Sequence, residues 1–260
     1  GARCGGGRGL DWRDEGIVLG ARRHGESAAI LEVFTAAHGR HAGVVRGGGS
    51  RRMAPLLQPG ARLALVWSAR LEEHVGAFRV DPIGSRTAVL LGDGAALAAL
   101  SALAALVSAA LPERDAHPRL YAESLALIDS LATAPDWPAR YAVWELALLA
   151  ELGFGLDLAC CAATGSREDL VWVSPRTGRA VSRSAGAPWA DRLLPLPGFL
   201  REGWTPGGVP DGAAVAEALA LTGHFLEARL APGLARGVLP AARGRAVAAL
   251  RGWAGIGRTG

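Results

Sequence analysis

The stretch ARLALVWSARL, residues 61–71, alternates apolar and polar residues with the two-residue period of a β-strand. Leu63, Leu65 and Trp67 fall on one face of it. Four further strand-like runs surround this stretch, at residues 16–25, 27–35, 41–47 and 74–83. The gap Gly25-Glu26 between the first two is compatible with a hairpin. Five short strands in about seventy residues predict a small closed or partly closed barrel, with the OB-fold as the leading candidate.

The pattern changes from strands to helices after Asp93-Gly94, which is a suitable helix start. The next apolar stretches predict helices that run to Pro112 and then over residues 118–133, 138–155, 189–201, 211–231 and 240–252. Gly153 is a good C-terminal cap for the third of them. A turn at residues 175–178 predicts a β-hairpin between residues 170–174 and 179–182.

These elements predict an α+β chain, in which an OB-fold barrel is followed by a mainly α-helical domain with a small β-hairpin module. The expected boundaries are an N-terminal extension at 1–10, the barrel at 11–84, the helical domain at 85–155, the module at 156–187, and C-terminal helices at 188–254 that pack on the helical domain. Residues 1–9 are expected to be disordered or upstream translation, with Leu10 as an alternative start.

The positive charge of the chain is informative only through its placement. All 28 basic residues are arginine, and lysine and asparagine are absent, which a GC-rich coding bias explains. The six arginines from Arg40 to Arg70 nevertheless have no acidic residue among them. A concentrated positive field of this kind attracts polyanions, although a solvated basic face is the alternative.

The sequence offers little support for an enzyme or a cofactor site. A Walker loop needs a lysine, which this chain lacks, and neither a GxGxxG after a strand nor a GxSxG elbow is present. His38 and His41 are close in sequence but have no third metal ligand at a recognisable spacing. We therefore expect no catalytic residues, no cofactor and no bound metal.

The stretch HAGVVRGGGSRRM, residues 41–53, could be a nucleotide pocket, a nucleic-acid surface or a flexible turn. Without a lysine the first interpretation fails. A basic, glycine-rich connection on a barrel fits contacts to a nucleic-acid backbone, because arginine binds phosphate bidentately. Stacking platforms are expected on such a surface, and Phe34, Trp67 and Phe78 are candidates that could equally belong to the core.

A family resemblance rests on long, ordered segments. DWRDEGIVLGARRHGESAAILEVFTAAHGRHAGVVRGGGSRR, LQPGARLALVW and ELALLAELGFGLDLACCAATGSREDLVWVSPRTGRAVS resemble RecO, the bacterial recombination mediator, and the match runs from Asp11 to about Leu250. The resemblance implies an N-terminal OB-fold, a helical domain and, in some members, a four-cysteine zinc site. It also implies a protein that is not an enzyme and that binds single- and double-stranded DNA, anneals complementary strands and, with RecR, helps load RecA.

The cysteines depart from the zinc-bearing pattern of that family. Cys160 and Cys161 stand where the first pair would be, and RTGRAVSRSAG offers serines in place of the second pair. Serine is a poor zinc ligand, so we expect a zinc-finger-like module that lacks its zinc ligands. Packing of Val171, Trp172 and Val173 would then hold its hairpin.

The resemblance also suggests where the partners bind. For DNA, the expected arginines on the barrel are Arg22, Arg23, Arg40, Arg46, Arg51 and Arg52. For the acidic C-terminal tail of single-strand-binding protein, the expected arginines lie in the helical region and are Arg114, Arg119 and Arg140. RecR is a further expected partner, RecF is another candidate, and a membrane is not.

Two other classes of protein stay open at this stage. One is an RNA-binding OB-fold protein, and the other is an adaptor whose barrel binds protein. The N-terminus lacks the apolar stretch of a signal peptide, and the longest apolar run, at residues 95–111, is short for a membrane span. We expect a cytoplasmic, nucleoid-associated protein.

Overall fold

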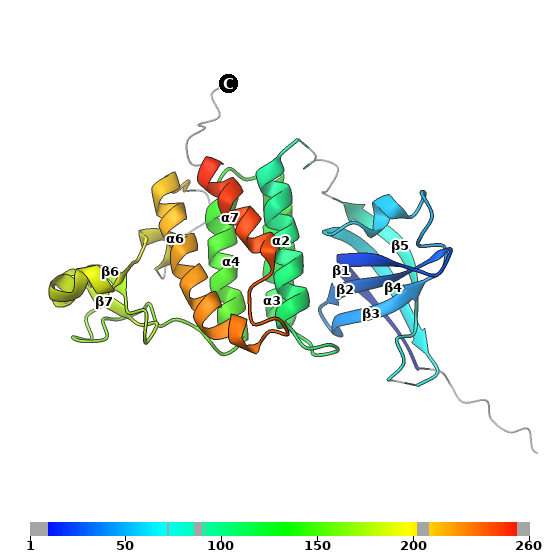
Figure 1. The fold of residues 1–260 in the computed structure, drawn as a ribbon, viewed down its shortest axis with the longest axis horizontal. Coiled ribbons are helices and arrows are strands. Elements are labelled where there is room, and N and C mark those ends of the chain that lie inside the picture. Colours follow the sequence, from blue (N-terminus) through cyan, green and yellow to red (C-terminus); the bar gives the residue numbers. More distant parts are fainter. Residues whose placement is uncertain (1–9, 72, 86–89, 91, 202–207, 254–260) are drawn as a thin grey trace, which may run out of the picture. The chain divides into compact units, whose positions relative to one another are not determined.

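The computed structural model describes residues 10–71, 73–85, 90, 92–201 and 208–253. The extension expected at 1–10 therefore lies outside the described residues, except for Leu10. The chain divides into two compact units, one of Gly1–Val89 with Leu111–Ala122 and the other of Leu90–Ala110 with Glu123–Gly260. The two units contain the elements labelled in Figure 1.

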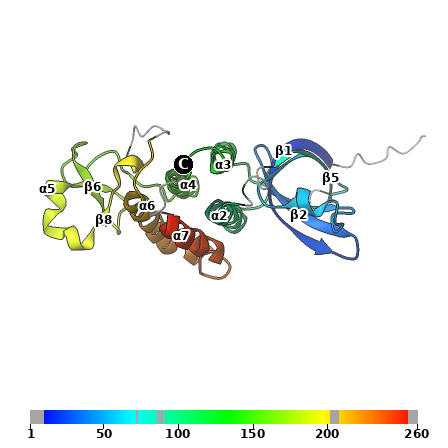
Figure 2. The same cartoon turned by 90° about the horizontal axis from the view of Figure 1, so that it is seen from above.

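The first unit is a closed five-stranded barrel with strand order β1-β2-β3-β5-β4. Figure 2 shows its strands curving around a common axis. The strands are β1 Leu10–His24, β2 Ala28–Thr35, β3 Gly39–Val45, β4 Ala61–Ala69 and β5 Ala77–Ser85, and a 3-10 turn, η1, spans Ala54–Leu57. All neighbouring strands are antiparallel except β3 and β5, which are parallel. This order confirms the predicted OB-fold barrel.

Alternation along the strands fills the inside of the barrel with apolar side chains. Leu63, Leu65 and Trp67 of β4 are almost fully buried, as their spacing predicts. Leu57 of η1 is buried in the same cluster, and Met53 packs against it. The barrel interior is therefore a packed core, and a ligand has to bind on the outside of the barrel or at its rim.

Residues 111–122 complete the barrel unit although they follow a long helix in the sequence. The Tyr121 ring meets Phe34 edge-to-face at 5.6 Å, and the Arg114 backbone N–H donates to the carbonyl oxygen of Arg40. At Gly39, whose φ is +61°, a Cβ would lie 1.8 Å from the Asp115 carbonyl oxygen. Only glycine fits there, so this close approach fixes the segment on the start of β3.

The second unit consists of helices and a small three-stranded sheet. Its helices are α2 Gly94–Ala110, most of α3 Pro118–Leu131, α4 Trp137–Glu151, α5 Arg183–Gly186, α6 Gly212–Phe225 and α7 Ala241–Trp253. The sheet order is β7-β6-β8, with β6 Leu170–Val173, β7 Ala180–Ser182 and β8 Leu194–Pro195. The short turns are η2 Ala187–Arg192, η3 Gly198–Leu200, η4 Leu226–Leu230, which is π-helical, and η5 Ala231–Gly233.

Two helix ends that the sequence predicts are confirmed, the start of α2 and the end of α4. The Asp93 carboxylate accepts from the backbone N–H groups of Ala95 and Ala96, which caps the start of α2. Gly153 follows the end of α4 with a φ of +80°, as a C-terminal glycine does. None of the helices in the described part of the chain has both the length and the apolar character needed to cross a bilayer.

The helix predicted over residues 189–201 is wrong. The structure has the turns η2 and η3 there, with β8 between them. Pro195 and Pro197 explain the difference, because proline lacks the backbone donor that a helix interior requires and disfavours helical geometry in the residue before it. The segment instead adds a third strand to the predicted β6–β7 hairpin.

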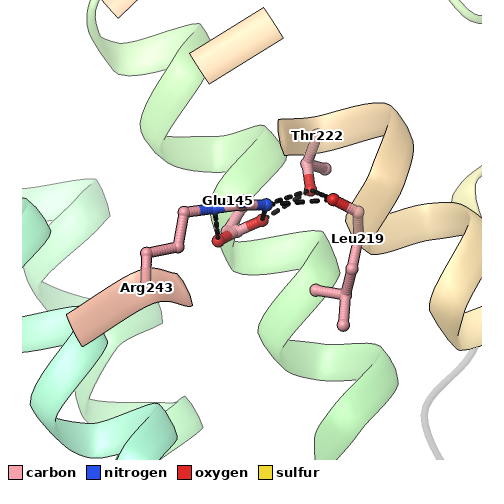
Figure 3. A network of polar contacts seen from close by, with 4 residues as sticks. All are labelled: Glu145, Leu219, Thr222 and Arg243. Atoms are coloured by element: carbon pink, nitrogen blue, oxygen red, sulfur yellow. Dashed lines mark hydrogen bonds and ion pairs between the residues drawn. The ribbon is translucent and has the colours of Figure 1, made fainter. Parts of the chain in front are cut away.

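A buried ion pair joins three helices of the second unit (Figure 3). Arg243 of α7 donates from Nε and Nη2 to the two carboxylate oxygens of Glu145 on α4, at 2.8 and 3.0 Å. Its Nη2 also donates to the carbonyl oxygen of Leu219 on α6, and the Thr222 hydroxyl donates to Glu145. Glu145 is fully buried, so this pairing satisfies a charge that water does not reach.

Candidate nucleic-acid interface

The glycine-rich loop after β3 is an ordered series of turns packed against the β1–β2 hairpin. The Gly49 backbone N–H donates to the Ser27 carbonyl oxygen at 3.0 Å, and Gly48 and Ser50 donate back to Val45 and Gly47. A Cβ on Gly48 would lie 2.9 Å from the Cβ of Ala29. The glycines therefore let the loop lie directly on the hairpin.

Five of the six predicted DNA-binding arginines gather at this end of the barrel and are exposed. They are Arg22, Arg23, Arg46, Arg51 and Arg52. Arg23 donates from Nη2 to the Gly49 carbonyl oxygen at 3.4 Å, which links the hairpin to the loop. Within the described part of the chain, no side-chain hydrogen bond or ion pair is assigned to the other four. Their charge is available to an external anion.

The outer face beside these arginines is apolar. Arg22 pairs across the sheet with Ile30, and Ile30 pairs with Val44 of β3. Residues directly opposite one another in neighbouring strands point to the same face, so Arg22 flanks the two half-buried aliphatic side chains. In OB-folds, this face of the second and third strands and the adjoining loops form the surface used for oligonucleotides.

Arg40 differs from the other five predicted arginines because it is paired inside its own unit. Its Nη1 donates to Glu32 at 2.6 Å and lies 3.5 Å from the Glu113 carboxylate, and its Nε donates to the Leu111 carbonyl oxygen. Only 18% of its side chain is exposed. Arg40 thus holds residues 111–113 on the barrel, and this geometry does not favour a contact with DNA.

The three aromatic residues considered as platforms belong to the core. Phe34, Trp67 and Phe78 are all at most 4% exposed. A cluster at the barrel rim was not foreseen: Trp12 stacks on His38 with ring centroids 4.0 Å apart and meets the buried His41 edge-on. Burial lowers the pKa of His41 below its usual value and so favours the neutral ring among these aromatics. The alternation of Trp12 with charged neighbours was the signal that strand β1 starts before residue 16.

The three arginines predicted for tail binding are not brought together within either unit. Arg114 and Arg119 belong to the barrel unit, whereas Arg140 belongs to the helical unit. Arg140 pairs with the buried Asp136 at 2.9 Å. Arg114 lies over the Trp67 ring, at the edge of a hollow of about 230 Å³ that is also lined by Trp12 and His38.

Comparison with known proteins identifies the family. Residues 10–86 match the model described as Recombination protein O N terminal, and residues 91–236 match Recombination protein O C terminal. The chain belongs to the RecO family. This membership, which the sequence segments had predicted, gives the chain a role in DNA repair and recombination.

RecO relatives match nearly the full length. The chain is 60% identical over 236 residues to "DNA repair protein RecO" of Cereibacter sphaeroides, covering 91% of this chain and 96% of the relative. It is 55% identical over 238 residues to the protein of the same name in Roseobacter denitrificans, covering 92% and 97% of the two chains. The corresponding protein of Ruegeria sp. is 54% identical over 241 residues, covering 93% and 98%.

In the zinc-finger-like module of this RecO chain, hydrogen bonds to sulfur hold the buried cysteine. Cys161 is buried, and its Sγ accepts from both the backbone N–H and the hydroxyl of Ser182. Burial raises the pKa of the Cys161 thiol, but the hydrogen bonds from Ser182, Thr164 and Ala163 outweigh it and hold the pKa at about 6. Among the described residues, no group of three or more His, Cys, Asp or Glu side chains could hold a metal ion. Two thiols and a serine are a donor set that does not fit zinc.

Proposed function

We propose that this RecO chain is a recombination mediator that binds single- and double-stranded DNA through the exposed arginines around its glycine-rich loop. The observation that carries this proposal is the gathering of Arg22, Arg46, Arg51 and Arg52 at one end of the barrel without acidic partners. Arginines in this state neutralise phosphates and release counterions, which favours binding without regard to base sequence. Arg23 belongs to the same surface.

Neutralised strands can approach each other, so annealing of complementary single strands is part of the proposal. With RecR, and with RecF as a further candidate, the chain would help load RecA onto DNA coated by single-strand-binding protein, during repair of gaps and double-strand breaks. The protein would make these changes without forming or breaking covalent bonds. It would act in the cytoplasm, in association with the nucleoid.

Recruitment by the acidic tail of single-strand-binding protein completes the proposed function. Arg114, Arg119 and Arg140 stay the candidate contacts. The position of Arg114 supports tail binding most directly. An arginine at the edge of a hollow lined by Trp12, His38 and Trp67 suits a tail that carries acids and an aromatic end.

The test is strand binding and annealing by the double variant Arg51→Ala, Arg52→Ala. Each lost phosphate contact should lower the slope of log affinity against log salt by roughly 0.7 on single strands, so the double variant should lose about 1.4. We expect equal weakening on unrelated sequences and slower annealing. The matched control is Arg236→Ala, Arg245→Ala, which removes the same charge from exposed positions of the helical unit.

Three outcomes separate this proposal from its rivals. A double variant that keeps the parent's affinity and salt slope would remove the loop from the DNA site. Tighter binding to RNA than to DNA of the same sequence would favour an RNA-binding protein, because 2′-hydroxyl contacts discriminate the two. A parent with no salt-dependent affinity for nucleic acid would favour a protein-binding adaptor.

A further inference from the structure

Trp189 is the most prominent exposed aromatic side chain among the described residues of the helical unit. It lies in the turn η2 with 56% of its surface exposed. Tryptophan is usually well buried in folded proteins, so a ring exposed to this extent needs a reason. The guanidinium of Arg192 lies 5.6 Å from the ring centroid, in the range of a cation–π contact.

Packing and strand pairing fix the backbone on both sides of the turn that carries Trp189. A Cβ on Gly186 would lie 2.6 Å from Cδ1 of Trp172 and 2.9 Å from Cδ1 of Leu193, so the backbone before the turn packs directly on these side chains. After the turn, Leu194 and Pro195 pair with β6. A backbone held at both ends limits the positions that the ring can take, which lowers the entropic cost of binding a ligand.

The charge around this ring suits a polyanion. Residues 170–201 contain five arginines and a single acid, Asp191. Arg179 and Arg183 pair with Asp157 and Asp169, which precede this segment in the sequence. Arg176, Arg192 and Arg201 are exposed as well. Arg192 also lies 4.0 Å from the exposed Asp191 carboxylate. The segment as a whole therefore carries a net positive charge, and of its arginines Arg192 lies against the Trp189 ring.

We infer that Trp189 is a stacking platform for unpaired bases of single-stranded DNA, and that Arg192 beside it contacts the adjoining phosphates. This inference rests on the proposed DNA binding and adds a second contact point, in the C-terminal module. Base stacking on aromatic rings combined with basic side chains is how single strands are held without sequence preference. Tryptophan and arginine are also enriched at protein–protein interfaces, but acidic residues are depleted there, and the exposed Asp191 lies two positions from Trp189.

The experiment compares two strands with the same number of phosphates, one with normal bases and one with abasic sites. Both should be longer than the roughly 4–16 nucleotides that one OB-fold covers. In full-length protein, Trp189→Ala should raise the Kd for the normal strand about five-fold or more and leave the Kd for the abasic strand unchanged. Trp189→Phe should keep most of the parent's affinity, because it keeps a ring.

The matched control is Val238→Ala, which trims another exposed apolar side chain of the same unit, 63% exposed, and should change neither Kd. The melting temperature should change little in all variants, because more than half of each side chain is exposed. An unchanged Kd of Trp189→Ala for the normal strand would overturn the inference, and so would an equal loss on both strands. A parent that binds neither strand would instead overturn the proposed function.

Discussion

The buried ion pair of the helical unit and the glycine-rich loop of the barrel unit use arginine in opposite ways. Arg243 of the helical unit is 7% exposed and gives three hydrogen bonds to Glu145 and Leu219. Arg46, Arg51 and Arg52 of the barrel unit lie in solvent around a glycine loop. The same kind of side chain is a buried structural partner at Arg243 and an exposed charge at the glycine-rich loop. The role of an arginine depends on whether its anionic partner belongs to the protein or to a ligand. The number of arginines in the sequence does not reveal this.

Removing one member of the buried pair should have the largest effect. Arg243→Met leaves the buried Glu145 side chain without its cationic partner, and we expect a loss of about 3–5 kcal/mol in the free energy of unfolding. Urea unfolding of the full-length protein measures it. The double variant Glu145→Leu, Arg243→Met is the control, because it removes both charges and should recover most of the loss. A single variant as stable as the parent would contradict the contrast between the units.

An intermediate effect is expected from Arg40, which belongs to the barrel but is paired. Arg40→Ala removes its bonds to Glu32 and Leu111 and should lower the free energy of unfolding by about 1–2 kcal/mol. Its side chain is partly exposed, so this loss is smaller than that of Arg243. The salt slope of DNA binding, measured in parallel, should stay that of the parent. A lower slope with unchanged stability would place Arg40 among the DNA contacts.

The smallest effect on stability is expected from Arg46, which directly follows β3, the strand that contains Arg40. Arg46→Ala removes an exposed charge and should change the free energy of unfolding by less than about 0.5 kcal/mol. The salt slope of single-strand binding should nevertheless fall by roughly 0.7. Arg40→Ala is its matched control, since both changes remove one arginine from the β3 region. If both variants changed stability and salt slope by the same amounts, ion pairing would not explain the difference between Arg40 and Arg46.

Much of the fold was predictable from the sequence because it depends on local signals. Alternation gave the five strands, Asp93 and Gly153 gave helix ends, and the turn at residues 175–178 gave the β6–β7 hairpin. The start of β1 was placed too late, because the charged Asp14 stands where the alternation of Leu10 and Trp12 would put the next apolar residue. The helix over 189–201 failed because the apolar pattern outweighed Pro195 and Pro197 in that prediction.

The candidate site was predictable only in part. The basic glycine loop was visible as a run of residues, but the partner of each arginine was not. Arg40 is paired with Glu113, which is 73 positions away in the sequence. Contacts at such a separation leave no local pattern, so the sequence could not distinguish Arg40 from Arg46. The rim cluster of Trp12, His38 and His41 was hidden for the same reason.

The attachment of residues 111–122 to the barrel has a consequence for the order of synthesis. When the ribosome has made β5, the outer surface of Phe34 still lacks Tyr121, and Arg40 still lacks Glu113. The 37 residues 86–122 have to follow first. At roughly 5–20 residues per second, that takes about two to seven seconds. The nascent barrel is thus incomplete while α2 is being translated, and a gene fragment that stops after β5 encodes a barrel with an uncovered apolar side.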